Sequence, residues 1–119
     1  MTLRIALAAA ALAAAVPSTA LAELARISDR ATFVATVQGR ELSRLGISLR
    51  VSPNGSIAGR ALGRDVTGTW EWQNGLFCRT LDAGDRQWER NCQAVSVDGG
   101  SIRFQADEGQ GDIADFRIR

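Results

Sequence analysis

From Glu41 onward, this 119-residue chain alternates apolar with polar residues in short runs, which glycine-containing turns separate. Such alternation is typical of strands that bury one face, and short turns join antiparallel neighbours. About seven runs of this kind fit between residue 41 and residue 119. The pattern therefore predicts a mainly β fold, a small antiparallel meander over residues 41–119 that is closed as a barrel or folded as a sandwich.

The turn residues predict how these strands pair. We treat residues 45–51 as one half-buried strand that begins with Leu45. Three hairpin registers follow from the turns: Val51 with Ile57 across Pro53-Asn54-Gly55, Gly59 with Gly68 across Gly63-Arg64, and Val95 with Ile102 across Asp98-Gly99. Two facing glycines leave space over the sheet, which an indole can fill or a small ligand can occupy.

One segment ahead of the strands has a helical pattern instead. Ser28 can cap a helix N-terminus, and Gly39 suits the left-handed position just after its C-terminus. Phe33 and Val37 have the i, i+4 spacing that places them on one side. We expect a short helix over residues 28–38, which packs against one end or edge of the sheet.

The stretch from Gly68 to Cys92 holds the three tryptophans, Trp70, Trp72 and Trp88, and the only two cysteines, Cys78 and Cys92. One intramolecular disulfide is therefore possible, and it crosses between neighbouring strands if the next turn centres on Asp85. Two registers remain open. In the one we favour, Asn74-Gly75 is a two-residue turn, Phe77 and Leu81 point inward, and the cysteines lie on the outer face. In the other, a bulge turns Leu76 and Cys78 inward.

The N-terminus reads as an export signal. Arg4 precedes an apolar, alanine-rich run of residues 5–16, and Ala20-Leu21-Ala22 matches a cleavage site. We expect a signal peptide over residues 1–22, cleaved after Ala22, and a single β-domain over residues 23–119. The run is too short to cross a bilayer. The mature chain should therefore be periplasmic or secreted, without membrane attachment.

Charge and composition exclude several function classes. Once Arg4 is removed, 13 arginines balance 13 acidic residues, and the chain contains no histidine or lysine. A neutral balance argues against nucleic-acid binding. Without histidine there is no imidazole base or histidine metal site, and the disulfide occupies both cysteines. We therefore predict no catalytic residue, no metal and no cofactor.

Arg79 is the candidate centre of a binding site. In the favoured register it faces inward, opposite Trp70 and near Asn91, with Trp72 on the same face. It can serve structure by stacking or by extending its charge to solvent. Alternatively, it can anchor an anion beside an aromatic floor, with Arg79, Trp70, Trp72 and Asn91 as the ligand-binding residues. Trp88 and Arg90 can instead mark a protein-facing patch.

The mature chain resembles a group of short exported bacterial proteins of uncharacterised function. The resemblance rests on Ser28-Asp29-Arg30, Leu45-Gly46-Ile47, Pro53-Asn54-Gly55, Gly59-Arg60-Ala61, Val66-Thr67-Gly68-Thr69-Trp70, Gly75-Leu76-Phe77-Cys78-Arg79, Asn91-Cys92-Gln93 and Asp115-Phe116-Arg117-Ile118-Arg119. Some similar sequences are labelled dihydrodipicolinate reductase, but this chain has neither a dinucleotide-binding unit nor the length for two domains. More loosely, it looks like small periplasmic inhibitors of proteases or lysozyme.

Two functions are consistent with these features. The first is a non-enzymatic binding or accessory module, a monomer that takes a small anionic ligand. The alternative is an inhibitor of an exported hydrolase, which would bind a periplasmic protein through a loop or through the edge near Trp88.

Overall fold

The computed structural model describes residues 24–119. The predicted signal peptide, residues 1–22, and its cleavage site after Ala22 lie outside the described residues. Within the described residues, the first strand begins at Ala25.

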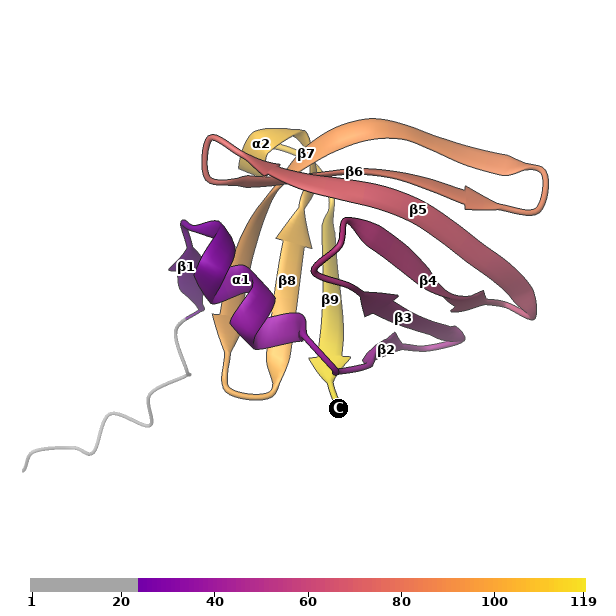
Figure 1. Ribbon diagram of the computed structural model, residues 1–119, viewed down its shortest axis with the longest axis horizontal. Coiled ribbons are helices and arrows are strands. Elements are labelled where there is room, and N and C mark those ends of the chain that lie inside the picture. Colours follow the sequence, from indigo (N-terminus) through magenta and orange to yellow (C-terminus); the bar gives the residue numbers. More distant parts are fainter. Residues whose placement is uncertain (1–23) are drawn as a thin grey trace, which may run out of the picture.

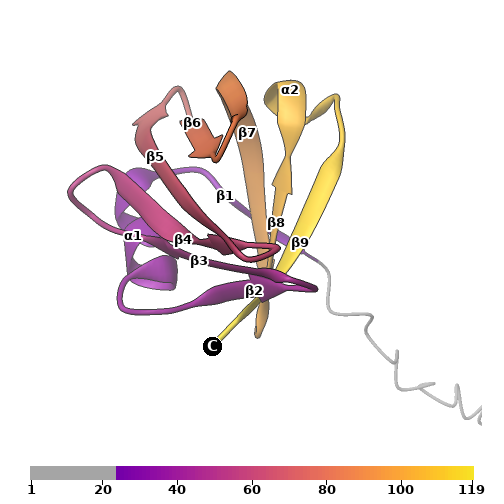
Figure 2. The ribbon, with the colours of Figure 1, turned by 90° about the vertical axis from the view of Figure 1, so that its right-hand side faces the viewer.

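Eight strands close into an antiparallel barrel (Figures 1 and 2). Each strand pairs with the next one along the chain, and the last returns to the first. They are β2 (Leu42–Arg44), β3 (Ile47–Val51), β4 (Ser56–Ala61), β5 (Arg64–Gln73), β6 (Leu76–Ala83), β7 (Arg86–Asp98), β8 (Ser101–Gln105) and β9 (Ile113–Ile118). The predicted fold class is confirmed, and closure of β2 on β9 makes it a barrel.

A ninth strand, β1 (Ala25–Ile27), lies outside the closed ring and pairs with the C-terminal half of β7. Both β1 and β2 have only three residues, too few to show an alternating pattern. The estimate of about seven strands was low for this reason.

The predicted helix forms as α1 (Arg30–Val37). Its N-cap is Asp29, whose carboxylate accepts a hydrogen bond from the Thr32 backbone N–H at 3.0 Å; the prediction of Ser28 was one residue early. Phe33 and Val37 are fully buried, as the i, i+4 spacing predicts. An isolated helix of this length is unstable in water, so these two anchors hold it in place.

Phe33 joins α1 to the interior of the barrel. Its ring lies 5.0–5.2 Å, centre to centre, from Trp70, Trp72 and Phe77 and 6.4 Å from Phe104. Because those rings project inward from β5, β6 and β8, α1 closes one end of the barrel, as expected.

The hairpin registers are partly confirmed. Val51 pairs with Ile57, as predicted. The β4–β5 turn, however, is Leu62-Gly63, with φ of 51° and 81°, so Gly59 faces Val66 and not Gly68. The β7–β8 turn is likewise Gly99-Gly100, which pairs Ile102 with Val97 and not with Val95. Both errors are shifts of two residues, which leave every side chain on its predicted face.

Leu45 was assigned wrongly. It lies in the turn between β2 and β3, where its side chain is 98% exposed. The run we took as one strand is therefore divided by a Leu45-Gly46 turn, because Gly46 adopts a φ of 74° that ends the extended backbone.

The Cys78–Cys92 disulfide forms between directly opposed residues of β6 and β7. Asn74-Gly75 is the two-residue turn of the favoured register, with positive φ at both residues. Cys78 also pairs with Glu71, which is exposed, whereas the flanking Phe77 and Arg79 face the interior. The sulfurs therefore lie on the outer face.

A tight turn, α2 (Ala106–Gly109), joins β8 to β9. β8 ends at Gln105, directly before this turn. Asp107 and Glu108 have φ of 53° and 59°, a left-handed conformation that costs non-glycine residues free energy. The turn packs against β7.

Candidate functional site

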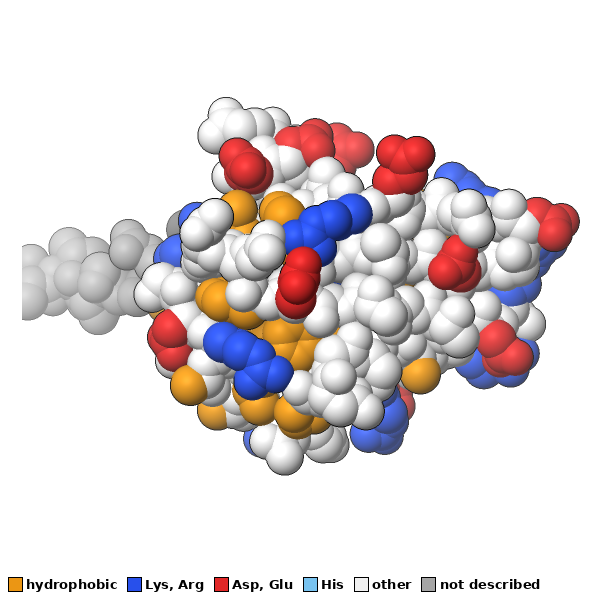
Figure 3. Space-filling model, turned by 45° about the horizontal axis from the view of Figure 1, so that its top comes forward, with side chains coloured by type: hydrophobic (Ala, Val, Ile, Leu, Met, Phe, Trp, Pro, Cys, Tyr) orange, Lys and Arg blue, Asp and Glu red, His pale blue; other side chains and the backbone are white. Residues whose placement is uncertain are grey.

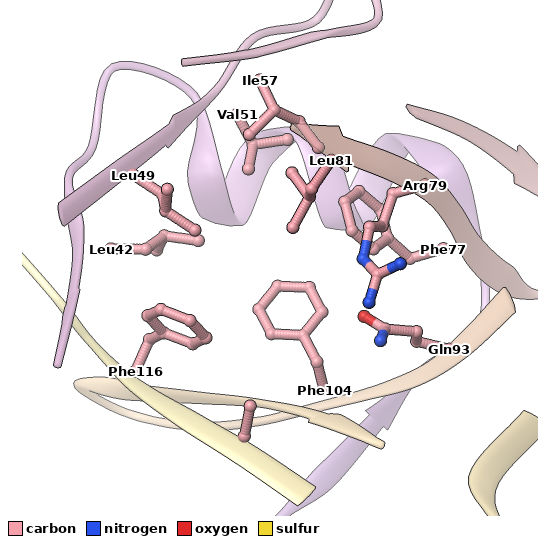
Figure 4. A pocket seen from close by; sticks show the side chains of 11 residues that line it. Leu42, Leu49, Val51, Ile57, Phe77, Arg79, Leu81, Gln93, Phe104 and Phe116 are labelled. Atoms are coloured by element: carbon pink, nitrogen blue, oxygen red, sulfur yellow. The ribbon is translucent and has the colours of Figure 1, made fainter. Parts of the chain in front are cut away.

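The barrel interior contains a cavity of about 130 Å³ (Figure 4). Every barrel strand except β5 contributes to its wall. Nine of the lining side chains are apolar: Leu42, Leu49, Val51, Ile57, Phe77, Leu81, Phe104, Ala114 and Phe116. The other two are Arg79 and Gln93. The wall is therefore apolar apart from two neighbouring polar groups.

The period-two pattern accounts for this lining, since each of these residues occupies an inward position of its strand. One small side chain helps to leave the space open. Ala114 pairs with Phe104 across β8 and β9, so the wall has only a methyl group beside the Phe104 ring.

The predicted glycine gap does not form the cavity. A Cβ on Gly59 would lie 2.0 Å from the Ser48 carbonyl oxygen, and one on Gly68 would lie 2.3 Å from the Thr80 carbonyl oxygen. These glycines allow neighbouring backbones to approach each other closely. They leave no space for a ligand.

Of the residues that the structure describes, Arg79 supplies the only charge in the cavity wall. In Figure 4 its side chain extends into the interior from β6 toward Gln93. One guanidinium nitrogen donates a hydrogen bond to the Glu89 carbonyl oxygen at 3.1 Å. Among residues 24–119, no carboxylate forms an ion pair with it. Burial lowers the pKa of Arg79 below its usual value, because desolvation disfavours the charged form.

Gln93 is the second polar group, and the sequence analysis missed it. It lies on β7 opposite Phe77 and is 8% exposed. Within the described part of the chain, no hydrogen bond satisfies its side-chain amide, which faces the cavity beside Arg79 (Figure 4). The pairing of Cys78 with Cys92 could have revealed it, since that register turns the next residue inward.

The predicted aromatic floor lies elsewhere. Trp70 donates its indole N–H to the Ser52 carbonyl oxygen at 2.8 Å, and the Arg30 guanidinium lies 5.2 Å from its ring centre. Trp72 stacks on Phe33. Neither indole lines the cavity, because α1 occupies their end of the barrel. Three phenylalanines supply the aromatic surface instead: Phe77, Phe104 and Phe116.

Asn91 pairs with Arg79 in register, as predicted, but its amide binds α2. It donates to the Asp107 carboxylate at 2.7 Å and accepts from the Asp107 backbone N–H at 3.0 Å. These two hydrogen bonds hold the left-handed turn in place. The structure therefore brings Arg79 and Gln93 together at the cavity and leaves Trp70, Trp72 and Asn91 away from it.

Two exposed leucines form a second feature. Leu45 and Leu62 are 98% and 81% exposed at the tips of adjacent hairpins. The Leu62 N–H donates to the Gly46 carbonyl oxygen at 2.8 Å, so the tips are joined. An open groove beside Leu45 contains four arginines and one acid: Arg44, Arg60, Arg117, Arg119 and Glu41. We refer to Leu45 and Leu62 as the leucine tips.

Elsewhere the surface is mixed in charge. On the face shown in Figure 3, acidic and basic side chains are interspersed. From residue 24 onward, no His, Cys, Asp or Glu side chains cluster in a way that could hold a metal ion. None of the helices in that part of the chain has the length and apolar character to cross a membrane.

Comparison with family models, with curated proteins and with solved structures finds no match to this chain. The functional argument therefore rests on the geometry of the barrel.

Proposed function

We propose that this protein is an exported, non-enzymatic binding module whose ligand lies inside the barrel. The observation that carries the proposal is the half-buried Arg79 guanidinium, which extends into the wall of an apolar cavity and has no carboxylate partner among residues 24–119. Even partial burial of an unpaired charge costs free energy, and a bound anion would offset that cost. Eight-stranded barrels are wide enough to hold one small ligand.

Binding fits the cavity chemistry better than catalysis. A guanidinium and an amide neither take up nor release a proton near neutral pH, so Arg79 and Gln93 can orient a ligand but cannot serve as a general acid or base. The disulfide supports residence in an oxidising compartment. Together with the N-terminal pattern, it favours a periplasmic or secreted protein that is cleaved after Ala22.

Native mass spectrometry of the protein isolated from the periplasm tests this proposal. We expect the wild type to retain a small additional mass that Arg79→Gln loses. Arg90→Gln is the matched control, because Arg90 lies on the outer face, where it pairs with Glu71 and Gln73. Equal retention by both variants would contradict the proposal, as would a bare chain in all three samples.

The leucine tips favour a second candidate function, inhibition of an exported hydrolase. Leu62 adopts a φ of 51°, where a leucine costs about 1 kcal/mol or more. Exposing the apolar side chain of Leu62 to water costs further free energy, and the fold does not require an apolar residue there. Two apolar tips on a rigid pair of hairpins could enter the cleft of an enzyme, with the nearby arginines against acidic groups at its rim.

A panel of exported proteases and lysozymes tests this alternative. If the tips act as proposed, one member is inhibited, and the double variant Leu45→Ser, Leu62→Asn weakens that inhibition at least tenfold. Ile113→Ser is the control, since Ile113 is 48% exposed on β9. Unchanged inhibition by the double variant, or no inhibition of any member, would refute this function.

A further inference from the structure

We infer that the ligand of the cavity is a monocarboxylate of about six carbon atoms, with its carboxylate at Arg79 and Gln93 and its apolar body among the phenylalanine and leucine side chains. The inference rests on the proposed function and adds the chemical class of the ligand. Charge, hydrogen bonding and volume each support one part of it.

The charge of the head group follows from the cavity wall. Arg79 contributes one positive charge, and Gln93 is neutral. A carboxylate brings one negative charge, which a single guanidinium neutralises. A doubly charged phosphate would leave a net negative charge in an apolar interior, which costs free energy.

The hydrogen-bonding groups of the cavity wall also match a carboxylate. A guanidinium has five N–H donors in a fixed fork, and only one bond, to the Glu89 carbonyl oxygen, is formed within residues 24–119. The remaining donors suit the two oxygens of a carboxylate. In Figure 4 the Gln93 amide oxygen lies toward the guanidinium and the amide nitrogen lies on its far side, and that N–H₂ group can provide a further hydrogen bond.

The volume sets the size of the body. The cavity measures about 130 Å³. An engineered apolar cavity of about 150 Å³ takes up benzene, a molecule of six carbons. Nine apolar side chains make up the rest of the wall, so a hydroxyl or second charge on the body would be buried without a partner.

Calorimetric titration of the disulfide-bonded protein with acetate, butyrate, hexanoate and decanoate tests the inference. We expect the affinity to rise about fourfold for each added methylene up to hexanoate. It should then fall for decanoate, because the longer chain exceeds the cavity. Hexanamide, which has the same tail without the charge, should bind at least tenfold more weakly than hexanoate. The methyl NMR signals of Leu42 and Leu49 should shift with each bound probe.

Variants of the protein test the contribution of the ligand's carboxylate separately from that of its apolar tail. Arg79→Gln should weaken hexanoate at least tenfold and leave hexanamide within about twofold, because the amide does not depend on the charge. Arg90→Gln removes the same charge from the outer face and should change neither. If Arg79→Gln does not fold, the ratio of hexanoate to hexanamide on the wild type still decides the question.

The outcomes distinguish the two proposals. Equal binding of hexanoate and hexanamide would overturn the carboxylate inference and leave the interior site standing. An affinity that rises through decanoate would overturn the size limit. If no probe binds and the Leu42 and Leu49 methyl signals do not shift, the interior site itself is wrong, and the proposed function fails with it.

Discussion

Filling the cavity should stabilise the protein while abolishing binding. Ala114→Leu adds three carbons at a position that faces Phe104 across the cavity wall. An enclosed empty cavity costs about 24 cal/mol for each Å³, so the 130 Å³ space costs at most about 3 kcal/mol, since Leu49, Leu81 and Phe116 in its wall are only half-buried. Burying three more carbons at about 0.8 kcal/mol each gives a similar ceiling of about 2.4 kcal/mol. Steric adjustment reduces the gain, and we expect the free energy of unfolding to rise by about 1–2 kcal/mol.

Urea unfolding followed by tryptophan fluorescence measures this change, and calorimetry with hexanoate measures the loss of binding. Ala58→Leu is the matched control, because Ala58 is exposed on the outer face of β4 and the same three carbons gain little there. A loss of more than about 1 kcal/mol in Ala114→Leu, with Ala58→Leu unchanged, would refute the reasoning. It would mean that the interior has no room for added carbons.

Three further substitutions test the contacts that hold α1, the α2 turn and the β8–β9 pair in place. Phe33→Ala should lower the free energy of unfolding by about 3–5 kcal/mol, measured in urea, because its fully buried ring fixes α1 to the barrel. Asn91→Ala should cost only about 1 kcal/mol but should speed proteolytic cleavage at Asp107, whose left-handed turn it releases. Arg103 donates two hydrogen bonds to Asp115 and holds the pKa of that carboxyl below its usual 3.8. The stabilisation that Arg103 and Asp115 provide is complete above the usual pKa of an aspartate. It is lost as the pH falls through the lowered pKa of Asp115. Arg103→Gln should therefore unfold more easily at neutral pH, and its difference from the wild type should shrink below about pH 4 in urea titrations.

The fold could be read from the sequence because alternation and turn chemistry are local signals. Errors arose where a turn used an unexpected residue. Leucine is a poor candidate for a left-handed turn position, so the Leu62-Gly63 turn was placed one residue late and the pairing shifted by two. Leu45 continued the alternation into the turn that Gly46 makes, so the pattern did not show where β2 ends and β3 begins. In the shifted hairpin the face of each inward residue was still predicted correctly, since a shift of two preserves it, whereas Leu45 itself is exposed.

The site was harder to predict, because alternation gives the side of a residue but not its height along the barrel. Arg79 was found because a two-residue Asn74-Gly75 turn places it opposite Trp70 on the inward face. Trp70 and Trp72 do face inward, yet the ring of Phe33 meets them from α1, and no local pattern shows which end a helix closes. Gln93 was overlooked because a polar residue at an inward position attracts notice only once the register is known.

Closure of the barrel has a consequence for how the chain must fold. Only two residue pairs, Leu42 with Ile118 and Ser43 with Arg117, join β2 to β9, and two backbone hydrogen bonds between Glu41 and Arg119 extend the seam. Until β9 is in place, β2 and β8 are open strand edges, which template association between chains. A chain that emerges with its N-terminus first keeps the edge of β2 exposed while some 70 residues follow. Folding without association between chains therefore depends on keeping that edge covered until β9 pairs with it.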